Sequence, residues 1–178
     1  KDISHPNLIR VFDAESSDDG HVLVTMRYVQ GVSLKRSIDS RAPIGEGFAL
    51  REIEPLFLQL RDALIELHPS MVHGNLKPAN IIIQPDFLKI TDLGLAEFLP
   101  PETFARAQRG SDDAVYLAPE ILSGSAPAPS ADIFTVGRLL SMMLIGQAPD
   151  DASSVKFYAG DEEVDELIRS TYARATDQ

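Results

Sequence analysis

Two pairs of short segments follow the two-residue period of β-strands. The first pair, residues 8–15 (LIRVFDAE) and 21–29 (HVLVTMRYV), is rich in β-branched residues and is divided by the polar run SSDDG. The second pair, residues 80–84 (NIIIQ) and 88–91 (LKIT), is divided by the turn dipeptide Pro85-Asp86. The pattern predicts two strands before residue 31 and a tight hairpin over residues 80–91.

Other segments repeat their apolar residues at the period of a helix. Ser33 is expected to cap a short helix with an apolar stripe of Leu34 and Ile38. A leucine-rich stripe covers residues 50–67 and predicts a long helix. Proline is best tolerated in the first turn of a helix, so we expect this helix to begin near Pro55.

A third helical pattern begins after the turn-rich run SGSAPAPS. Ser130 is expected to cap this helix, which ends at Gly146, and its apolar stripe runs from Ile133 to Leu144. A last helix is expected from Asp161, where acidic residues suit the positive end of the helix dipole. Together these patterns predict a chain with small β-hairpins and a larger helical part.

Composition narrows the classes of function. The chain has 178 residues, which fits one domain, and a formal net charge of −11. This acidity argues against duplex nucleic acid and against an anionic membrane surface. No cysteine is present, so disulfides, thiolate metal sites and cysteine nucleophiles are excluded, and a reducing, cytoplasmic setting is expected. The longest apolar run, residues 139–145, is too short to span a bilayer.

The hairpin over residues 80–91 brings polar side chains together. Its two ends lie side by side, so we expect Asn75, Lys77, Asn80 and Asp92 to converge on one small volume. A carboxylate and an amide supply oxygen ligands for Mg²⁺, and a lysine pairs with phosphate oxygens. The sequence therefore predicts a site suited to a metal-bound polyphosphate.

The same residues resemble a known family. His73–Asn80 (HGNLKPAN) resembles the catalytic loop of protein kinases, His-Arg-Asp-Leu-Lys-Pro-x-Asn, and Asp92-Leu93-Gly94 resembles the Asp-Phe-Gly metal motif. Ala118-Pro119-Glu120 is similar to the motif that closes the activation segment. The resemblance implies one partial α+β protein-kinase-like domain over residues 1–178. Residues 1–31 would be a β-hairpin remnant of the small lobe, residues 32–178 the helical large lobe, and residues 92–120 the activation segment.

One position departs from the family pattern. Asn75 stands where the catalytic-base Asp is expected, and an amide has neither the charge nor the basicity of a carboxylate. The resemblance implies that Lys77 lies near a γ-phosphate and that Asn80 and Asp92 are a relic Mg²⁺ site. The plainer alternatives are a surface lysine, a turn-capping amide and a loop acid.

The resemblance also implies a relic nucleotide pocket. Met26 would be the gatekeeper, Tyr28 and Val29 would belong to the hinge, and Ile82 would lie under the adenine. The alternative is that Met26 only fills the strand core. The glycine-rich lid and the strand lysine of the family are absent from these residues. No cofactor is therefore expected, and ATP with Mg²⁺ would bind only if a small lobe lies outside this fragment.

Four residues are expected in structural roles that the resemblance implies. His73 and Leu93 would pack in the internal spine with Val11, and Asp132 would hold the catalytic-loop backbone. Alternatively, Asp132 is only an acid favoured by the helix dipole. Glu120 would pair with an arginine in a later helix.

The expected activation segment differs from the family in two ways. Gly74 replaces the arginine that receives activation-loop phosphate, so phosphorylation of Thr103 or Ser111 would lack its usual partner. Asp112 and Asp113 stand between Gly110-Ser111 and the Tyr-x-Ala-Pro-Glu motif, and this spacing puts peptide-substrate docking in doubt.

Two functions follow from these residues. The first is a catalytically inactive protein-kinase-like (pseudokinase) domain that binds another protein and regulates signalling, without nucleic-acid or direct membrane contact. The alternative is a weak ATP-dependent Ser/Thr protein phosphotransferase whose small lobe lies outside the fragment. His-Gly-Asn also resembles the loop of small-molecule kinases, but the Ala-Pro-Glu motif favours the protein kinases.

Overall fold

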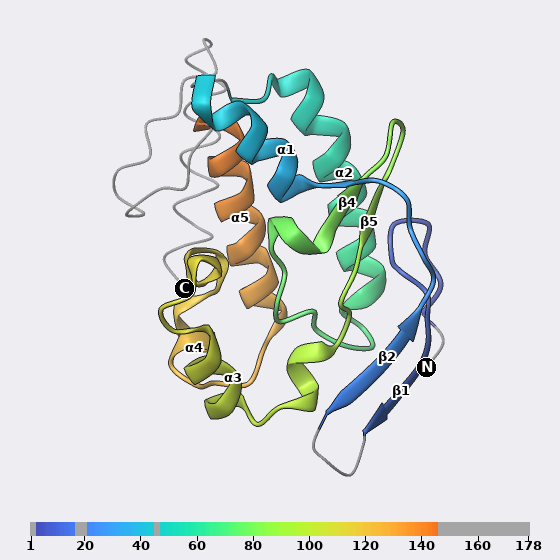
Figure 1. Cartoon of the computed structure of the whole chain (residues 1–178), viewed down its shortest axis with the longest axis vertical. Helices are drawn as coiled ribbons and strands as arrows, with labels where there is room; N and C mark the ends of the chain where they lie inside the picture. The colour runs from blue at the N-terminus through green and yellow to red at the C-terminus, as the bar shows by residue number, and fades with distance from the viewer. Residues whose placement is uncertain (1–2, 17–20, 45–46, 146–178) are drawn as a thin grey trace.

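A computed structural model describes residues 3–16, 21–44 and 47–145 of the chain. It contains two small antiparallel sheets and a larger helical part, which confirms the expected α+β class. In the view of Figure 1, the hairpin of β1 (Val11–Ser16) and β2 (Val22–Met26) lies at one side of the molecule and α5 (Pro129–Ile145) lies towards the other. The last helix expected from Asp161 lies outside the described residues.

The first hairpin forms as its alternating sequence predicts. β1 pairs with β2 in antiparallel register, from Val11 opposite Met26 to Ser16 opposite Val22, with an irregularity between Val11 and Asp13. The pairing continues one residue beyond the strands, because the amide of Arg27 donates to the carbonyl of Arg10 at 2.8 Å. Residues 10 and 27 therefore face each other at the open end of the hairpin.

The second sheet has three short strands in the order β3 (Val32–Ser33), β4 (Ile81–Ile83) and β5 (Leu88–Ile90). A turn at residues 84–87, closed by a hydrogen bond from the Gln84 amide to the Phe87 carbonyl, joins β4 to β5. The predicted hairpin over residues 80–91 is therefore confirmed. A short parallel bridge between Leu8 and Ile90 joins the start of the described chain to β5.

Helix α1 (Leu34–Arg41) has the predicted cap and stripe. The Ser33 hydroxyl accepts a hydrogen bond from the amide of Arg36 at 3.3 Å, and Leu34 and Ile38 are buried. A short 3₁₀ turn, η1 (Ala42–Ile44), follows α1.

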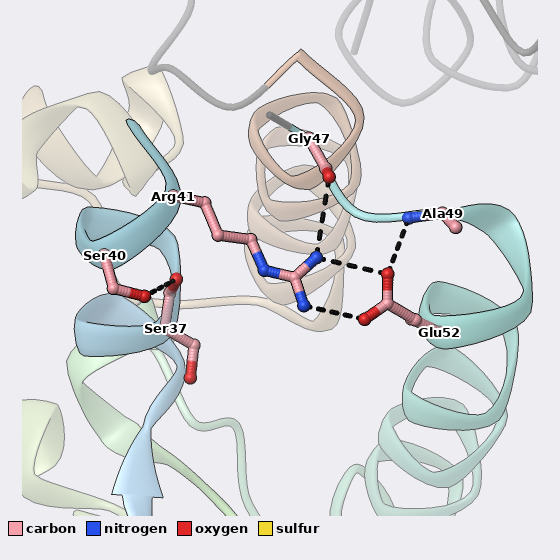
Figure 2. Close-up of polar contacts among 6 residues, drawn as sticks. All are labelled: Ser37, Ser40, Arg41, Gly47, Ala49 and Glu52. Atoms are coloured by element: carbon pink, nitrogen blue, oxygen red, sulfur yellow. Dashed lines mark hydrogen bonds and ion pairs between the residues drawn. The ribbon is translucent and has the colours of Figure 1, made fainter. Parts of the chain in front are cut away.

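Helix α2 (Leu50–Leu67) begins before Pro55, so the expected start near that proline is wrong. Figure 2 shows the reason: Arg41 at the end of α1 forms a two-pronged ion pair with Glu52, at 2.7 and 3.1 Å. Glu52 also accepts a hydrogen bond from the Ala49 amide at 2.9 Å, and the Arg41 guanidinium lies 3.9 Å from the centre of the Phe48 ring. These contacts stabilise the first turn ahead of Pro55, which is exposed.

Helix α5 begins at Pro129, so Ser130 lies within its first turn and the predicted Ser130 cap is wrong. Proline favours the first helical position because the N–H that it lacks would have no hydrogen-bond partner there.

The main core is formed between α1, α2, α5 and the second sheet. It includes Ile38, Leu64, Leu67, Leu76, Ile81, Leu88, Ile90, Leu139 and Met143.

The segment between β5 and α5 contains more helix than its sequence pattern predicted. It forms η3 (Leu95–Phe98), α3 (Pro101–Gln108), η4 (Asp112–Tyr116) and α4 (Pro119–Leu122). Phe104 of α3 and Ile121 of α4 are buried in a second, smaller core with Leu117 and Ala131. These apolar contacts to distant residues stabilise helices too short to show a clear period in the sequence.

Candidate active site

Asp132 of α5 binds the backbone at the start of the loop over residues 73–80. One carboxylate oxygen of Asp132 accepts the His73 amide at 2.9 Å, and the other accepts the Gly74 amide at 2.9 Å. The Nε2 of His68, at the end of α2, lies 3.0 Å from the same oxygen that binds His73. Asp132 is buried, with 1% of its surface exposed, and these contacts satisfy its charge without solvent.

The imidazole of His73 is fully buried and links two parts of the loop. Its Nε2 donates to the carbonyl of Thr91 at 2.9 Å, and its Nδ1 accepts the amide of Asn75 at 3.3 Å. These two roles define the neutral ring, and burial lowers the pKa of His73 below its usual value. His73 therefore acts as an uncharged structural link between the 73–80 loop and the end of β5.

Gly74 has the backbone conformation that glycine favours. Its φ is +66°, and a Cβ at this position would lie 2.8 Å from the Cβ of Pro127. A side chain here would be strained and would also clash with the neighbouring loop. The sequence difference from the family arginine therefore fits the local packing.

Asn75 and Asn80 lie side by side. The side-chain amide of Asn80 donates to the Asn75 carbonyl at 3.1 Å, and the η2 turn (Pro78–Asn80) precedes β4 directly. The side-chain oxygen of Asn75 is buried and has no hydrogen-bond partner. Burying an oxygen without a hydrogen-bond partner costs folding free energy, so the surrounding fold must hold the Asn75 side chain in this position.

Asp92 follows β5, across the hairpin from Asn80. The backbone of Thr91, the residue before it, donates to the Asn80 carbonyl at 2.9 Å. Asp92 has φ of +61°, the one non-glycine residue with positive φ among the described residues. Its carboxylate makes no hydrogen bond or ion pair within that part of the chain. Aspartate tolerates this conformation better than most residues, but it is still strained.

The oxygen donors at the hairpin ends suit a hard cation. Asn80 directs its amide nitrogen at the loop, which leaves its oxygen for another partner, and the Asp92 carboxylate is unengaged. Amide and carboxylate oxygens are the ligands that Mg²⁺ prefers, and it usually takes the remaining ligands from phosphate and water. Within residues 3–16, 21–44 and 47–145, no three His, Asp or Glu side chains cluster as a metal site. The two oxygens can therefore supply only part of a Mg²⁺ shell.

Lys77 is paired within the chain. Its ammonium lies 2.7 Å from a carboxylate oxygen of Asp113, in η4, and both side chains are largely buried, with 17% and 28% exposed. The acid thus comes from the expected activation segment, next to the expected catalytic loop. This contact neutralises the cation that the sequence predicted beside a γ-phosphate.

The position of Asp113 is fixed by α5. Thr135 donates to the carbonyl of Tyr116 at 2.7 Å, and Arg138 donates to the carbonyl of Val115 at 2.8 Å. The Tyr116 hydroxyl contacts the sulfur of Met142, and burial raises the pKa of Tyr116 to about 12. Three side-chain contacts on one helix therefore hold the η4 turn that presents Asp113.

Only two of the four residues expected at the nucleotide pocket line the same cavity. Tyr28 and Val29 line a pocket of about 910 Å³, together with Arg10, Arg27 and Lys89. Met26 and Ile82 are not among the residues that line it. Tyr28 is 86% exposed, whereas Met26, the last residue of β2, and Ile82, the middle residue of β4, are half-buried.

Leu93 and Glu120, the two other residues expected in structural roles, make packing or backbone contacts. Leu93 is partly buried and packs against the main core. Glu120 lies in α4, half-buried, and its backbone carbonyl accepts the Ser125 amide at 2.9 Å.

Sequence reasoning missed two partners of the site. The sequence pattern gives Asp113 no partner, and His68 lies just beyond the helix predicted over residues 50–67. No local pattern marks either residue, because Asp113 lies 36 residues from Lys77 and His68 lies 64 residues from Asp132. The pair of acids Asp112-Asp113 before Tyr116 is unusual for the family spacing, but it does not point to Lys77.

Comparison with known proteins supports the resemblance. The family model of the protein kinase domain matches residues 1–176. Serine/threonine-protein kinase pkn3 of Myxococcus xanthus is 30% identical over 169 residues, which cover 88% of this chain and 30% of that protein. Serine/threonine-protein kinase PrkC of Bacillus subtilis is 32% identical over 154 residues, covering 85% and 23%. Serine/threonine-protein kinase atg1 of Dictyostelium discoideum is 32% identical over 162 residues, covering 87% and 23%.

The chain therefore spans less than a third of the length of these relatives. The family match nevertheless covers nearly the whole chain, and the loop, hairpin and helix that carry the motif residues are all present in the fold. The chain belongs to the protein kinase domain family.

Proposed function

We propose that this chain is a catalytically inactive protein-kinase-like (pseudokinase) domain that binds another protein and regulates signalling. The observation that carries the proposal is the state of the 73–80 loop. Position 75 offers a buried amide oxygen in place of a carboxylate, and the ammonium of Lys77 is bound by Asp113. General-base catalysis typically contributes about 10²–10⁴-fold to a rate, and an amide cannot supply it.

The retained architecture supports a binding role. Asp132 and His73 hold the kinase-like loop through buried and partly buried hydrogen bonds, although position 75 is an amide. A fold kept intact around an altered site is suited to presenting a surface to a partner. We place this activity in the cytoplasm, in line with the absence of cysteine. No helix in the described part of the chain has the length and apolar character needed to cross a bilayer.

One observation favours a second candidate, a weak Ser/Thr protein phosphotransferase. Asp92 is strained and its carboxylate is unengaged, and such strain often accompanies a binding function. With a small lobe supplied by residues outside this fragment, Asn80 and Asp92 would hold Mg²⁺, which would screen the phosphate charges of ATP. Without it, we expect no cofactor.

The deciding experiment is phosphate transfer by the intact parent protein. We expect no incorporation of labelled phosphate from Mg-ATP into the protein itself or into a generic basic protein substrate. The Asn75→Asp variant tests whether the base alone is missing, and we expect it to be inactive too while Lys77 stays paired. Transfer by the parent protein that is lost in Asn75→Ala would refute the proposal and establish the second candidate.

A further inference from the structure

A pocket on the β-rich side of the molecule gathers three cationic side chains. Its volume is about 910 Å³, and it lies between the open end of the β1–β2 hairpin, the stretch at residues 27–30 and the β4–β5 turn. Arg10, Arg27 and Lys89 line it, from three separate strands or their ends. Their gathering is notable in a chain with a net charge of −11.

The two arginines are held opposite each other. The backbone hydrogen bond from the Arg27 amide to the Arg10 carbonyl, at 2.8 Å, extends the register of β1 and β2 by one pair. Directly opposed like charges on neighbouring strands destabilise a hairpin. The arrangement therefore has an electrostatic cost that a bound anion would remove.

Lys89 adds a third charge from β5. Its ammonium donates to the carbonyl of Leu8 at 3.3 Å. This hydrogen bond places the ammonium next to the residues just before Arg10 in the chain. Partial burial and the nearby charge of Arg27 lower the pKa of Lys89 below its usual value. The lysine is thus held near a like charge and partly away from water.

The cations lack counter-ions within the part of the chain that the structure describes. None of the pocket-lining residues is an Asp or Glu, and no ion pair involves Arg10, Arg27 or Lys89. Like charges held close together without a counter-ion repel each other. Arg10 does lie 5.9 Å from the Phe12 ring, but such a contact does not neutralise its charge.

We propose that this pocket binds a phosphomonoester carried by a side chain of a partner protein. A phosphorylated serine or threonine carries about −1.5 to −2 charges at pH 7, with three acceptor oxygens. Two guanidinium groups and an ammonium match that charge and those oxygens better than they match a single carboxylate. Ser4 and Gln30 also line the pocket, and their side chains are able to donate further hydrogen bonds.

The size and charge of the surroundings favour a short phosphorylated segment over a long polyanion. The pocket is much larger than one phosphate group and leaves room for flanking residues, with Phe87 and Tyr28 exposed at its lining. Nucleic acid is disfavoured, because a long phosphate backbone would also meet the net negative charge of the chain. The pocket is separate from Asn75 and Lys77, which do not line it. The inference does not depend on the proposed loss of catalysis.

A binding experiment without nucleotide tests the inference. The probe is a fluorescein-labelled glycine–alanine peptide with one central phosphoserine, and its serine counterpart is the reference. We expect the chain to bind the phosphopeptide, more weakly as salt increases, and to bind the serine peptide at least about tenfold more weakly. Arg27→Gln and Lys89→Gln should each weaken binding about tenfold. Arg106→Gln, which removes an exposed arginine of α3, is the matched control and should leave binding unchanged.

Several outcomes would overturn the inference. They are equal binding of both peptides, absence of phosphopeptide binding, and full binding by both pocket variants. Inorganic phosphate that competes as well as unlabelled phosphopeptide would show a free-phosphate site and overturn the assignment to a partner protein. Thermal unfolding of each variant verifies its fold, and because Arg27 is exposed, its replacement tests the pocket even if Lys89→Gln is destabilised. The assay contains no ATP, so its failure is separate from the failure of the pseudokinase proposal.

Discussion

The ammonium of Lys77 lies 2.7 Å from the carboxylate of Asp113, and this ion pair joins the 73–80 loop to the η4 turn of the segment before α5. The pair is largely buried, so it is screened by salt less than a surface pair would be. It ties together the two parts of a kinase domain that the resemblance assigns to catalysis and to the activation segment. The cation of the expected catalytic loop is therefore neutralised by an acid of the same chain.

Replacing Asp113 should remove this ion pair and destabilise the fold. We expect Asp113→Asn to lower the free energy of unfolding by about 1–2 kcal/mol, because a charged hydrogen bond between partly buried groups is lost. Asp112→Asn is the matched control, since Asp112 is exposed, and should change stability by less than about 0.5 kcal/mol. Urea denaturation measures both variants. A double variant with Lys77→Met should be less destabilised than the sum of the single changes, and full additivity would contradict the pairing.

Asp132 should be among the most sensitive positions in the molecule. In Asp132→Asn, the new NH₂ group faces a backbone amide of His73 or Gly74, so two donors oppose each other in a buried site. We expect a loss of about 3 kcal/mol or more in the free energy of unfolding. Asp62→Asn, at an exposed position of α2, is the control and should be nearly neutral. Equal denaturation midpoints for the two variants would refute the anchoring role.

The Arg41–Glu52 pair should make stability depend on pH in the acid range. The hydrogen bonds from Arg41 and the Ala49 amide lower the pKa of Glu52 from 4.5 to about 2. Because the folded pKa is lower, the contribution is complete above pH 4.5 and is lost as pH falls towards 2. Glu52 is part exposed, so the effect should be about 1 kcal/mol or less. Thermal melts between pH 2 and 6 measure it, and Glu52→Gln should flatten this component whereas Glu54→Gln should not.

The backbone of Asp92 gives a prediction that separates conformation from charge. Both Asp92→Gly and Asp92→Ala remove the carboxylate, but only glycine adopts φ of +61° without strain. We expect the glycine variant to be about 1 kcal/mol more stable than the alanine variant. Differential scanning calorimetry on the pair measures the difference. An alanine variant as stable as the glycine variant would show that this segment relaxes out of the strained conformation.

Much of the fold is determined by local sequence. The alternation of residues 80–91 around Pro85-Asp86 gives a tight hairpin, because the period of two places one face of each strand in the core and the turn fixes the register. Ser33 caps α1 as expected, since its hydroxyl satisfies an amide that the helix leaves unpaired. The start of α2 could not be predicted from Pro55, because the helix is extended ahead of this proline by the contact of Glu52 with Arg41 of α1.

The candidate site likewise has features that the sequence predicts and contacts that it does not predict. The sequence alone determined which residues occupy the loop and that position 75 is an amide, because motif spacing is a property of the chain. The pairing of Asp113 with Lys77 across 36 residues, and the contact of Lys89 with the Leu8 carbonyl across 81, form only when the chain folds. Such partners are selected by packing of whole elements, which brings distant side chains together and removes water from between them, and no local period in the sequence encodes that choice.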